Sequence, residues 1–302
     1  MGRFPYKSAI LVFSATLALA QEPTYSTSVT LVRLVVSVKN DQGQVVGDLQ
    51  KSDFKVFDSG VPQTIQYFEH HTEVPLSVSI LIDTSGSTGK DLDYETNAVG
   101  KFIRALLREG NPADAVALYS FNHEVTLEAS FTRNQGRLEN RLGRLKGESG
   151  TALYDAIYLA SRQVDDRDGR HVLIIVTDGG DTYSKQTFLS ALRTAQMAEA
   201  IVYPILVTPI TNEPGRNLGG EHVLSQLATD TGGRVFEPIQ SHQLDQRFAE
   251  ILRDLRTQYL LGYTPTGLPP GLPSFHPIRV ELNRKELKVS TRNGYYEDTA
   301  KR

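Results

Sequence analysis

The stretch Leu-Ser-Val-Ser-Ile-Leu-Ile-Asp-Thr-Ser-Gly-Ser, residues 76–87, decides the fold of this 302-residue chain. Its first half is apolar and rich in β-branched residues, which is typical of a strand buried on both faces. Its second half is polar, and Asp83, Ser85 and Ser87 alternate along it, so that their oxygen atoms can turn toward one point. They follow the carboxyl end of the strand, where open α/β sheets place their ligands. Hard oxygen ligands of this kind suit Mg²⁺, Mn²⁺ or Ca²⁺.

Two later stretches can complete such a site. Thr151 follows a glycine and precedes a segment with apolar residues at helical spacing. Residues 171–177, His-Val-Leu-Ile-Ile-Val-Thr, form a second apolar run that ends in Asp178-Gly-Gly-Asp181. If the two runs are parallel neighbours in one sheet, the carboxylates of Asp83 and Asp178 reach the same edge.

Taken in chain order, these residues resemble the metal-ion-dependent adhesion site of von Willebrand factor A domains. Residue type and order match at five positions, which are Asp83, Ser85, Ser87, Thr151 and Asp178. The resemblance implies that the three hydroxyls are ligands or near-ligands of a divalent cation, Mg²⁺ or else Mn²⁺ or Ca²⁺. It implies that the two carboxylates bind the ion directly or through water, with Asp155 and Asp181 as supporting groups. It also implies an open coordination position that favours a Glu or Asp side chain of a protein partner.

Between residues 76 and 257, predicted strands and helices alternate, which indicates a mainly parallel, doubly wound sheet with helices on both faces. The helices are expected at residues 94–107, 133–145, 152–164, 185–199, 221–229 and 244–255. The strands are expected at residues 76–82, 113–121, 125–131, 171–177, 201–207 and 234–237.

The chain on either side of this region is predicted to be all-β. Strands are expected at residues 29–39, 44–46, 55–57, 63–68, 258–263, 278–282 and 287–291, and residues 294–296 are expected to end the structured part. Either group alone is too small to be stable. We therefore expect one β-sandwich, formed by residues 21–73 and 258–302, with an α/β domain at 74–257 inserted between its halves. The whole chain resembles exported bacterial "VWFA-related" proteins, through Tyr259-Leu-Leu-Gly-Tyr263 and Gly294-Tyr295.

The first 20 residues are predicted to be a secretory signal peptide. Arg3 and Lys7 precede an apolar stretch at residues 8–20, which ends in the cleavage pattern Ala18-Leu-Ala20. The alternative, an uncleaved anchor, needs a longer apolar stretch, of about 20 residues. We expect an exported protein, periplasmic or secreted, that is not inserted in a membrane after cleavage.

Composition narrows the classes of function. The net charge of −3 and the pI of about 6.2 argue against non-specific binding to nucleic acid or anionic lipid. The basic helix around Arg137, Arg141 and Arg144 is interpreted as a solvated face. The absence of cysteine excludes disulfides and thiol catalysis.

Three hypotheses about function remain. The first is a non-enzymatic binding protein that engages an acidic residue of a partner through its cation. The second is a structural or assembly module of the cell envelope whose metal site only stabilises the fold. The third, a hydrolase that uses metal-bound water, lacks a general base, because every histidine lies away from the motifs in sequence.

Overall fold

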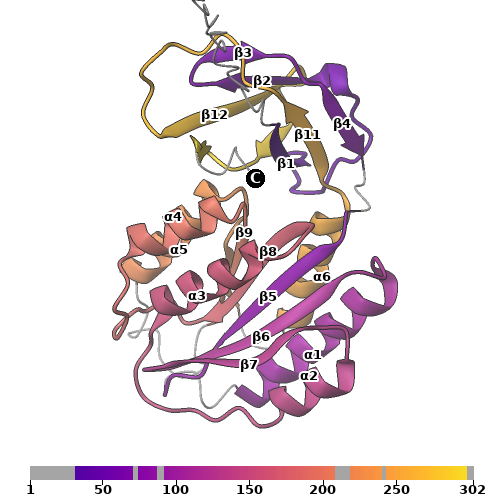
Figure 1. The fold of residues 1–302 in the computed structure, drawn as a ribbon. Helices are drawn as coiled ribbons and strands as arrows, with labels where there is room; N and C mark the ends of the chain where they lie inside the picture. The colour runs from indigo at the N-terminus through magenta and orange to yellow at the C-terminus, as the bar shows by residue number, and fades with distance from the viewer. Residues whose placement is uncertain (1–30, 71–73, 87–91, 208–217, 240–242, 298–302) are drawn as a thin grey trace, which may run out of the picture.

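The computed structural model describes residues 31–70, 74–86, 92–207, 218–239 and 243–297. A β-sandwich lies above a larger α/β unit in the view of Figure 1. The predicted signal peptide lies outside the described residues. Among the residues that are described, no helix is long and apolar enough to cross a membrane.

The α/β unit is built on a six-stranded sheet with the order β10-β9-β8-β5-β6-β7. The strands are β5 (Leu76–Asp83), β6 (Ala115–Phe121), β7 (Val125–Thr132), β8 (Arg170–Thr177), β9 (Ile201–Val207) and β10 (Phe236–Ile239). Only the β6–β7 pair is antiparallel, so the predicted mainly parallel sheet is confirmed. The helices are α1 (Leu92–Glu109), α2 (Gln135–Leu142), α3 (Leu153–Asp165), α4 (Phe188–Met197), α5 (Leu218–Asp230) and α6 (Leu244–Arg256).

Strand β5 is buried along its whole length because helices cover both of its faces. Its even-numbered residues, from Leu76 to Ile82, belong to the apolar core that also contains residues of α1, α2 and α6. Leu81 on the other face belongs to the core shared with α3, α4 and α5. Ser77 and Ser79 on that same face are small, and the facing helix α3 contributes Ala156 and Ala160, also small, to this core. The alternation places Asp83 on the α3 side of the sheet.

Each sheet of the sandwich contains strands from both ends of the chain. One sheet has the order β13-β1-β11-β4, with β1 (Val32–Lys39), β4 (Tyr67–His70), β11 (Tyr259–Tyr263) and β13 (Lys288–Ser290). The other has the order β14-β12-β2-β3, with β2 (Phe54–Asp58), β3 (Val61–Gln63), β12 (Phe275–Leu282) and β14 (Gly294–Tyr296). Their inner faces share one apolar core. The predicted insertion of the α/β unit between two halves of a sandwich is therefore confirmed.

The tyrosines near the C-terminus hold the N-terminal strands in place. The hydroxyl of Tyr259 accepts a hydrogen bond from the backbone N–H of Leu49 at 3.0 Å. The hydroxyls of Tyr263 and Tyr295 both donate to Oδ2 of Asp58, each at 2.9 Å. Asp58 has no exposed surface, so these two hydrogen bonds compensate its loss of water.

The predictions were wrong at several element boundaries. Residues 63–68 were expected to form one strand, but the chain crosses there from one sheet of the sandwich to the other, so β3 ends at Gln63 and β4 begins at Tyr67. Residues 44–46 were expected to form a strand. After the turn at Asn40 they make only an isolated bridge, between Val45 and Lys39. Helix α4 begins three residues later than expected, because the Thr187 side chain caps it by accepting from Ser190 N–H at 3.2 Å.

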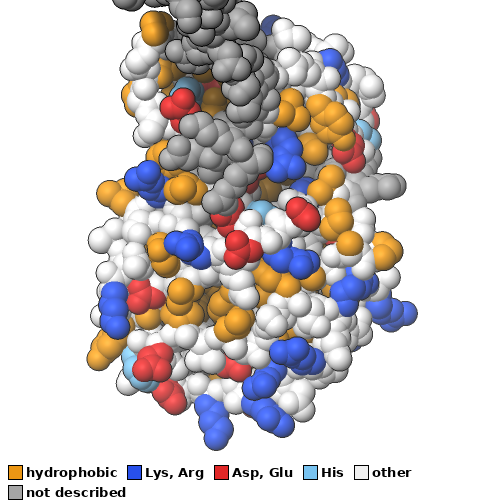
Figure 2. All heavy atoms as spheres, in the orientation of Figure 1, with side chains coloured by type: hydrophobic (Ala, Val, Ile, Leu, Met, Phe, Trp, Pro, Cys, Tyr) orange, Lys and Arg blue, Asp and Glu red, His pale blue; other side chains and the backbone are white. Residues whose placement is uncertain are grey.

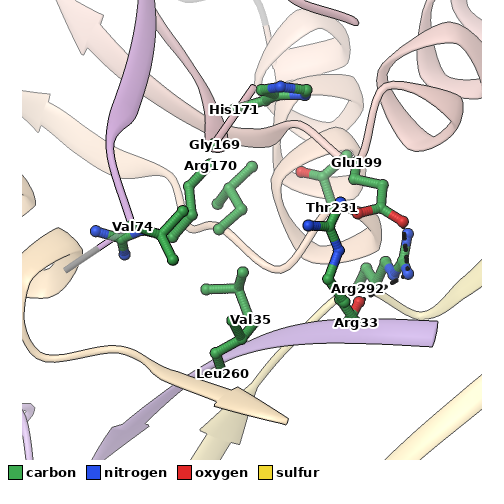
Figure 3. A pocket seen from close by; sticks show the side chains of 11 residues that line it. Arg33, Val35, Val74, Gly169, Arg170, His171, Glu199, Thr231, Leu260 and Arg292 are labelled. Atoms are coloured by element: carbon green, nitrogen blue, oxygen red, sulfur yellow. Dashed lines mark hydrogen bonds and ion pairs between the residues drawn. The ribbon is translucent and has the colours of Figure 1, made fainter. Parts of the chain in front are cut away.

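Polar contacts join the sandwich to the amino ends of the central strands. Lys39 of β1 contacts Asp254 of α6 at 2.8 Å, and Gln258 donates to the hydroxyl of Tyr203 of β9 at 3.2 Å. A cavity of about 60 Å³ lies at this junction, with Arg33, Glu199 and Arg292 grouped on one side of it (Figure 3). Since the cavity is lined by residues at the start of β8, it lies at the opposite end of the sheet from Asp83.

Candidate metal centre

Asp83 is the last residue of β5, and both oxygens of its carboxylate accept hydrogen bonds. Oδ1 accepts from the backbone N–H of Ser85 at 2.8 Å. Oδ2 accepts from the hydroxyl of Thr177, the last residue of β8, at 2.6 Å. The parallel register pairs Ile82 with Val176, so Asp83 and Thr177 are the next residues along and point to the same face. The carboxylate is fully buried and is oriented by two donors from neighbouring strands.

Asp178 acts on Asp83 through its charge. The pKa of Asp83 is raised to about 6, mainly by burial and to a smaller extent by the nearby charge of Asp178, while the hydrogen bonds from Thr177 and Ser85 oppose the shift. Asp178 directly follows β8 and is partly exposed. Two acidic side chains that repel each other at one edge of a sheet form a favourable position for a cation.

Thr151 is fastened to the loop that follows β8. Its backbone N–H donates to the hydroxyl of Thr182 at 3.0 Å, and its carbonyl accepts from the N–H groups of Thr182 and Tyr183 at 2.9 and 3.0 Å. The next residue, Ala152, donates its N–H to the carbonyl of Asn122 at 2.6 Å. Thr151 is therefore held between the loops after β6 and β8, at the edge where Asp83 and Asp178 lie.

Ser85 lies at the same edge and is buried. It forms an isolated parallel bridge with Glu148, and the N–H of Glu148 donates to the carbonyl of Thr84 at 2.8 Å. These contacts join the loop after β5 to the loop that leads to Thr151. The remaining predicted residue, Ser87, lies outside the described residues.

Asp155 and Asp181, expected as supporting groups, hold backbone atoms. The carboxylate of Asp155 accepts from the N–H groups of Lys185 and Gln186, at 3.1 and 2.7 Å. Asp181 accepts from the N–H of Tyr154 at 3.2 Å. Together they fix the start of α3 against the loop after β8, which keeps Thr151 near Asp178.

Thr177 was not predicted to be a functional residue. It was assigned only as the end of a strand. Its side chain lies on the same face of the sheet as those of Leu173 and Ile175, because alternate residues of a strand point the same way, and this face is covered by α3. Its hydroxyl donates to Asp83 and accepts from the N–H of Gly179 at 3.1 Å, where the chain turns with a positive φ of 97°. Thr177 therefore couples the orientation of Asp83 to the turn that carries Asp178.

The donor chemistry at this edge fits a hard divalent cation. Carboxylate and hydroxyl oxygens are the ligands that Mg²⁺, Mn²⁺ and Ca²⁺ take in proteins. In the described part of the chain, no group of three or more His, Cys, Asp or Glu side chains could hold a metal ion. A site at this edge would therefore depend on the hydroxyl oxygens as well as on the two carboxylates.

Comparison with known proteins gives a family match to part of the α/β unit. Residues 78–180 match the family model of the von Willebrand factor type A domain. No curated protein matches the chain.

Three solved structures from bacteria match part of this chain. The von Willebrand factor domain of the type V pili tip protein Mfa5 from Porphyromonas gingivalis is 13% identical, over 60% of this chain and 94% of that one, with a TM-score of 0.49. An aerotolerance-related membrane protein from Bacteroides fragilis is 18% identical, over 60% of this chain and 98% of that one, with a TM-score of 0.46. The PilB minor pilin from Streptococcus sanguinis is 12% identical, over 61% of this chain and 62% of that one, with a TM-score of 0.47.

Proposed function

Because residues 78–180 match the family model of the von Willebrand factor type A domain, we propose that this chain is a non-enzymatic binding protein that engages an acidic side chain of a protein partner through a divalent cation. The observation that supports this most strongly is the meeting of Asp83, Thr177 and the charge of Asp178 at one edge of the sheet. These groups come from two strands that are far apart in the chain.

The proposed cation, Mg²⁺ or else Mn²⁺ or Ca²⁺, would be held by Asp83, Ser85, Ser87, Thr151 and Asp178. When bound, it would supply an electrophilic centre that attracts a carboxylate of the partner. The hydroxyl groups are neutral, so only Asp83 and Asp178 offset the charge of the ion. The burial of Asp83 and its two hydrogen bonds orient its carboxylate before any ligand arrives.

The rest of the chain has a place in the same proposal. Residues 1–20 would direct export to the periplasm or the cell exterior, as the predicted signal peptide suggests. Residues 21–73 and 258–302 would flank the binding domain at 74–257 as one sandwich. The partner is a protein, with no role for nucleic acid or for insertion in a membrane.

Calorimetric titration of Mg²⁺ and Mn²⁺ into the full chain tests the metal site. Asp178→Ala should abolish binding, because one of the two charged ligands is removed. The matched control is Asp166→Ala, at the opposite end of α3, where the side chain is exposed. Unchanged metal affinity in Asp178→Ala would contradict the assignment of this residue.

Cross-linking of the protein to its neighbours in the source cells, with Mg²⁺ and with EDTA, tests the role of the ion. The proposal expects acidic partner segments that are recovered only with the ion. Equal recovery in EDTA, together with a Mg²⁺-dependent rise in thermal stability, would support the second function. In that case the protein is a structural or assembly module of the envelope with a stabilising metal site.

A further inference from the structure

One surface of this acidic chain is strongly basic. Residues 133–146 contain five Lys or Arg residues and one acidic residue, whereas the whole chain has a net charge of −3. Arg133 donates to backbone carbonyls of the neighbouring loop. The other four cations are exposed and make up what we name the basic stripe, namely Arg137, Arg141, Arg144 and Lys146. In Figure 2, Lys and Arg side chains gather over the lower right of the molecule, where α1 and α2 lie in Figure 1.

The stripe is exposed because the opposite side of α2 is apolar. Leu138 and Leu142 are buried in the core beneath α2, which fixes the rotation of the helix. The one acidic residue, Glu139, is already paired with Arg104 of α1 through its Oε1. It is therefore not available to neutralise the stripe.

The side chains of the stripe have no ion-pair or hydrogen-bond partner among the described residues. Arginines elsewhere are used differently, since Arg234 contacts Glu250 and Asp254, and Arg256 contacts Glu109. Like charges four residues apart on a helix, such as Arg137 and Arg141, destabilise it. A surface that concentrates unpaired positive charge on a negative protein is favourable once a negative partner covers it.

The loop that follows α2 connects the stripe to the candidate metal centre. The loop after α2 carries Lys146 and, two residues later, Glu148. Glu148 is bridged to Ser85, and its N–H donates to the carbonyl of Thr84 at 2.8 Å. A ligand that reaches the metal edge along this loop therefore passes the basic side chains.

We propose that the basic stripe binds an acidic protein segment next to the carboxylate that reaches the cation. This rests on the proposed function, because the partner is taken to be the same protein. Arg137 and Arg141, the two residues of the stripe that lie within α2, are separated by about 6 Å along its axis, which is close to the distance of about 6.7 Å between alternate residues of an extended segment. Acidic residues at alternate positions would match it.

A fluorescein-labelled oligoglutamate is the probe, and its binding to the full chain is measured by fluorescence anisotropy at low and high salt. The variant is Arg137→Gln/Arg141→Gln/Arg144→Gln, since Gln keeps the helix propensity of Arg. The control removes the same number of exposed charges from the sandwich, with Lys51→Gln/Lys55→Gln/Lys285→Gln. Circular dichroism checks that both variants are folded, and a triple Arg→Lys variant should retain binding.

At low salt, the stripe variant should bind oligoglutamate about tenfold more weakly than the wild type, and the difference should close at high salt. The control variant should bind as the wild type does. If both variants bound oligoglutamate equally weakly, the proposal would be overturned, because the loss of affinity would then follow from the change in net charge alone. The proposal would also be overturned if the stripe variant and the wild type bound oligoglutamate equally, while the stripe variant bound phosphatidylglycerol vesicles or duplex DNA more weakly than the wild type.

Repeating the titration in EDTA separates this proposal from the proposed function. If the stripe variant binds more weakly in EDTA as well, while wild-type binding is the same with Mg²⁺ and with EDTA, the basic stripe is upheld and the metal-dependent function fails. If wild-type binding needs Mg²⁺ and the stripe variant equals the wild type, the stripe is refuted and the metal-dependent function is upheld.

Discussion

Replacing Asp83 by Asn should stabilise the metal-free protein at neutral pH. Asp83 has no exposed surface, and burial raises the pKa of its carboxyl group from 3.8 to about 6. At a pH between these two values, the carboxyl group of Asp83 keeps its proton in the folded state and has lost it in the unfolded state. The stability contributed by the protonated carboxyl group is therefore complete below a pH of 3.8 and is lost as the pH rises through about 6.

The structure sets the size of the effect. A shift of about two pKa units corresponds to about 3 kcal/mol in the free energy of unfolding. The uncharged amide side chain of the Asp83→Asn variant would avoid this loss and can still accept from the N–H of Ser85. Its NH₂ group replaces the oxygen that accepts from Thr177, which costs about 1 kcal/mol. The expected net gain is about 2 kcal/mol near neutral pH in EDTA, with none in acid.

Mg²⁺ should reverse the order of stability. A ligand at a hundred times its dissociation constant stabilises a folded protein by about 2.7 kcal/mol. The wild type should gain this amount, and Asp83→Asn should gain little, because a charged ligand is missing. Urea unfolding followed by circular dichroism, in acid and at neutral pH, with EDTA and with Mg²⁺, measures all four conditions. A variant that is less stable than the wild type by the same amount in acid and at neutral pH would refute the reasoning.

Two further predictions concern the packing around the site and the sandwich. Tyr263→Phe removes a hydrogen bond to the buried Asp58 and should cost about 1.5–3 kcal/mol in urea unfolding, whereas Tyr67→Phe, at an exposed position, should cost much less. Equal costs for the two variants would show that the burial of Asp58 is unimportant. Gly220→Ala places a Cβ 1.5 Å from the carbonyl oxygen of Gly179, so it should lower the free energy of unfolding by about 1–3 kcal/mol and weaken Mg²⁺ binding in calorimetry. An unchanged melting temperature and an unchanged affinity for Mg²⁺ would argue against the close packing of α5 on the loop after β8.

The strands of the central sheet were predictable because their signal is local. Strand β5 was expected at residues 76–82 and occupies Leu76–Asp83, since a short apolar segment that contains β-branched residues and is followed by turn residues favours a strand. Boundaries set by distant contacts were not predictable in this way. The division of residues 63–68 between two sheets depends on the pairing of β4 with β11, which lies far away in the sequence.

The candidate metal centre was predicted as a list of residues, and its geometry was not. Asp83, Ser85, Thr151 and Asp178 followed from a pattern of residue types. The part played by Thr177 depends on register, because its hydroxyl reaches Asp83 only when β5 and β8 pair as they do. The basic stripe was interpreted as a solvated face, because the sequence did not show that the loop beyond it contacts Thr84 and Ser85.

By itself, the sequence determined which segments are strands and helices and which oxygen-bearing side chains follow the strands, because backbone preference and hydrophobic periodicity act over a few residues. Only the tertiary structure decided which of those side chains meet. The pairing of β5 with β8 buries Asp83 and gives it Thr177 as a donor. This contact spans 94 positions of the chain, and only the packing of the whole sheet produces it.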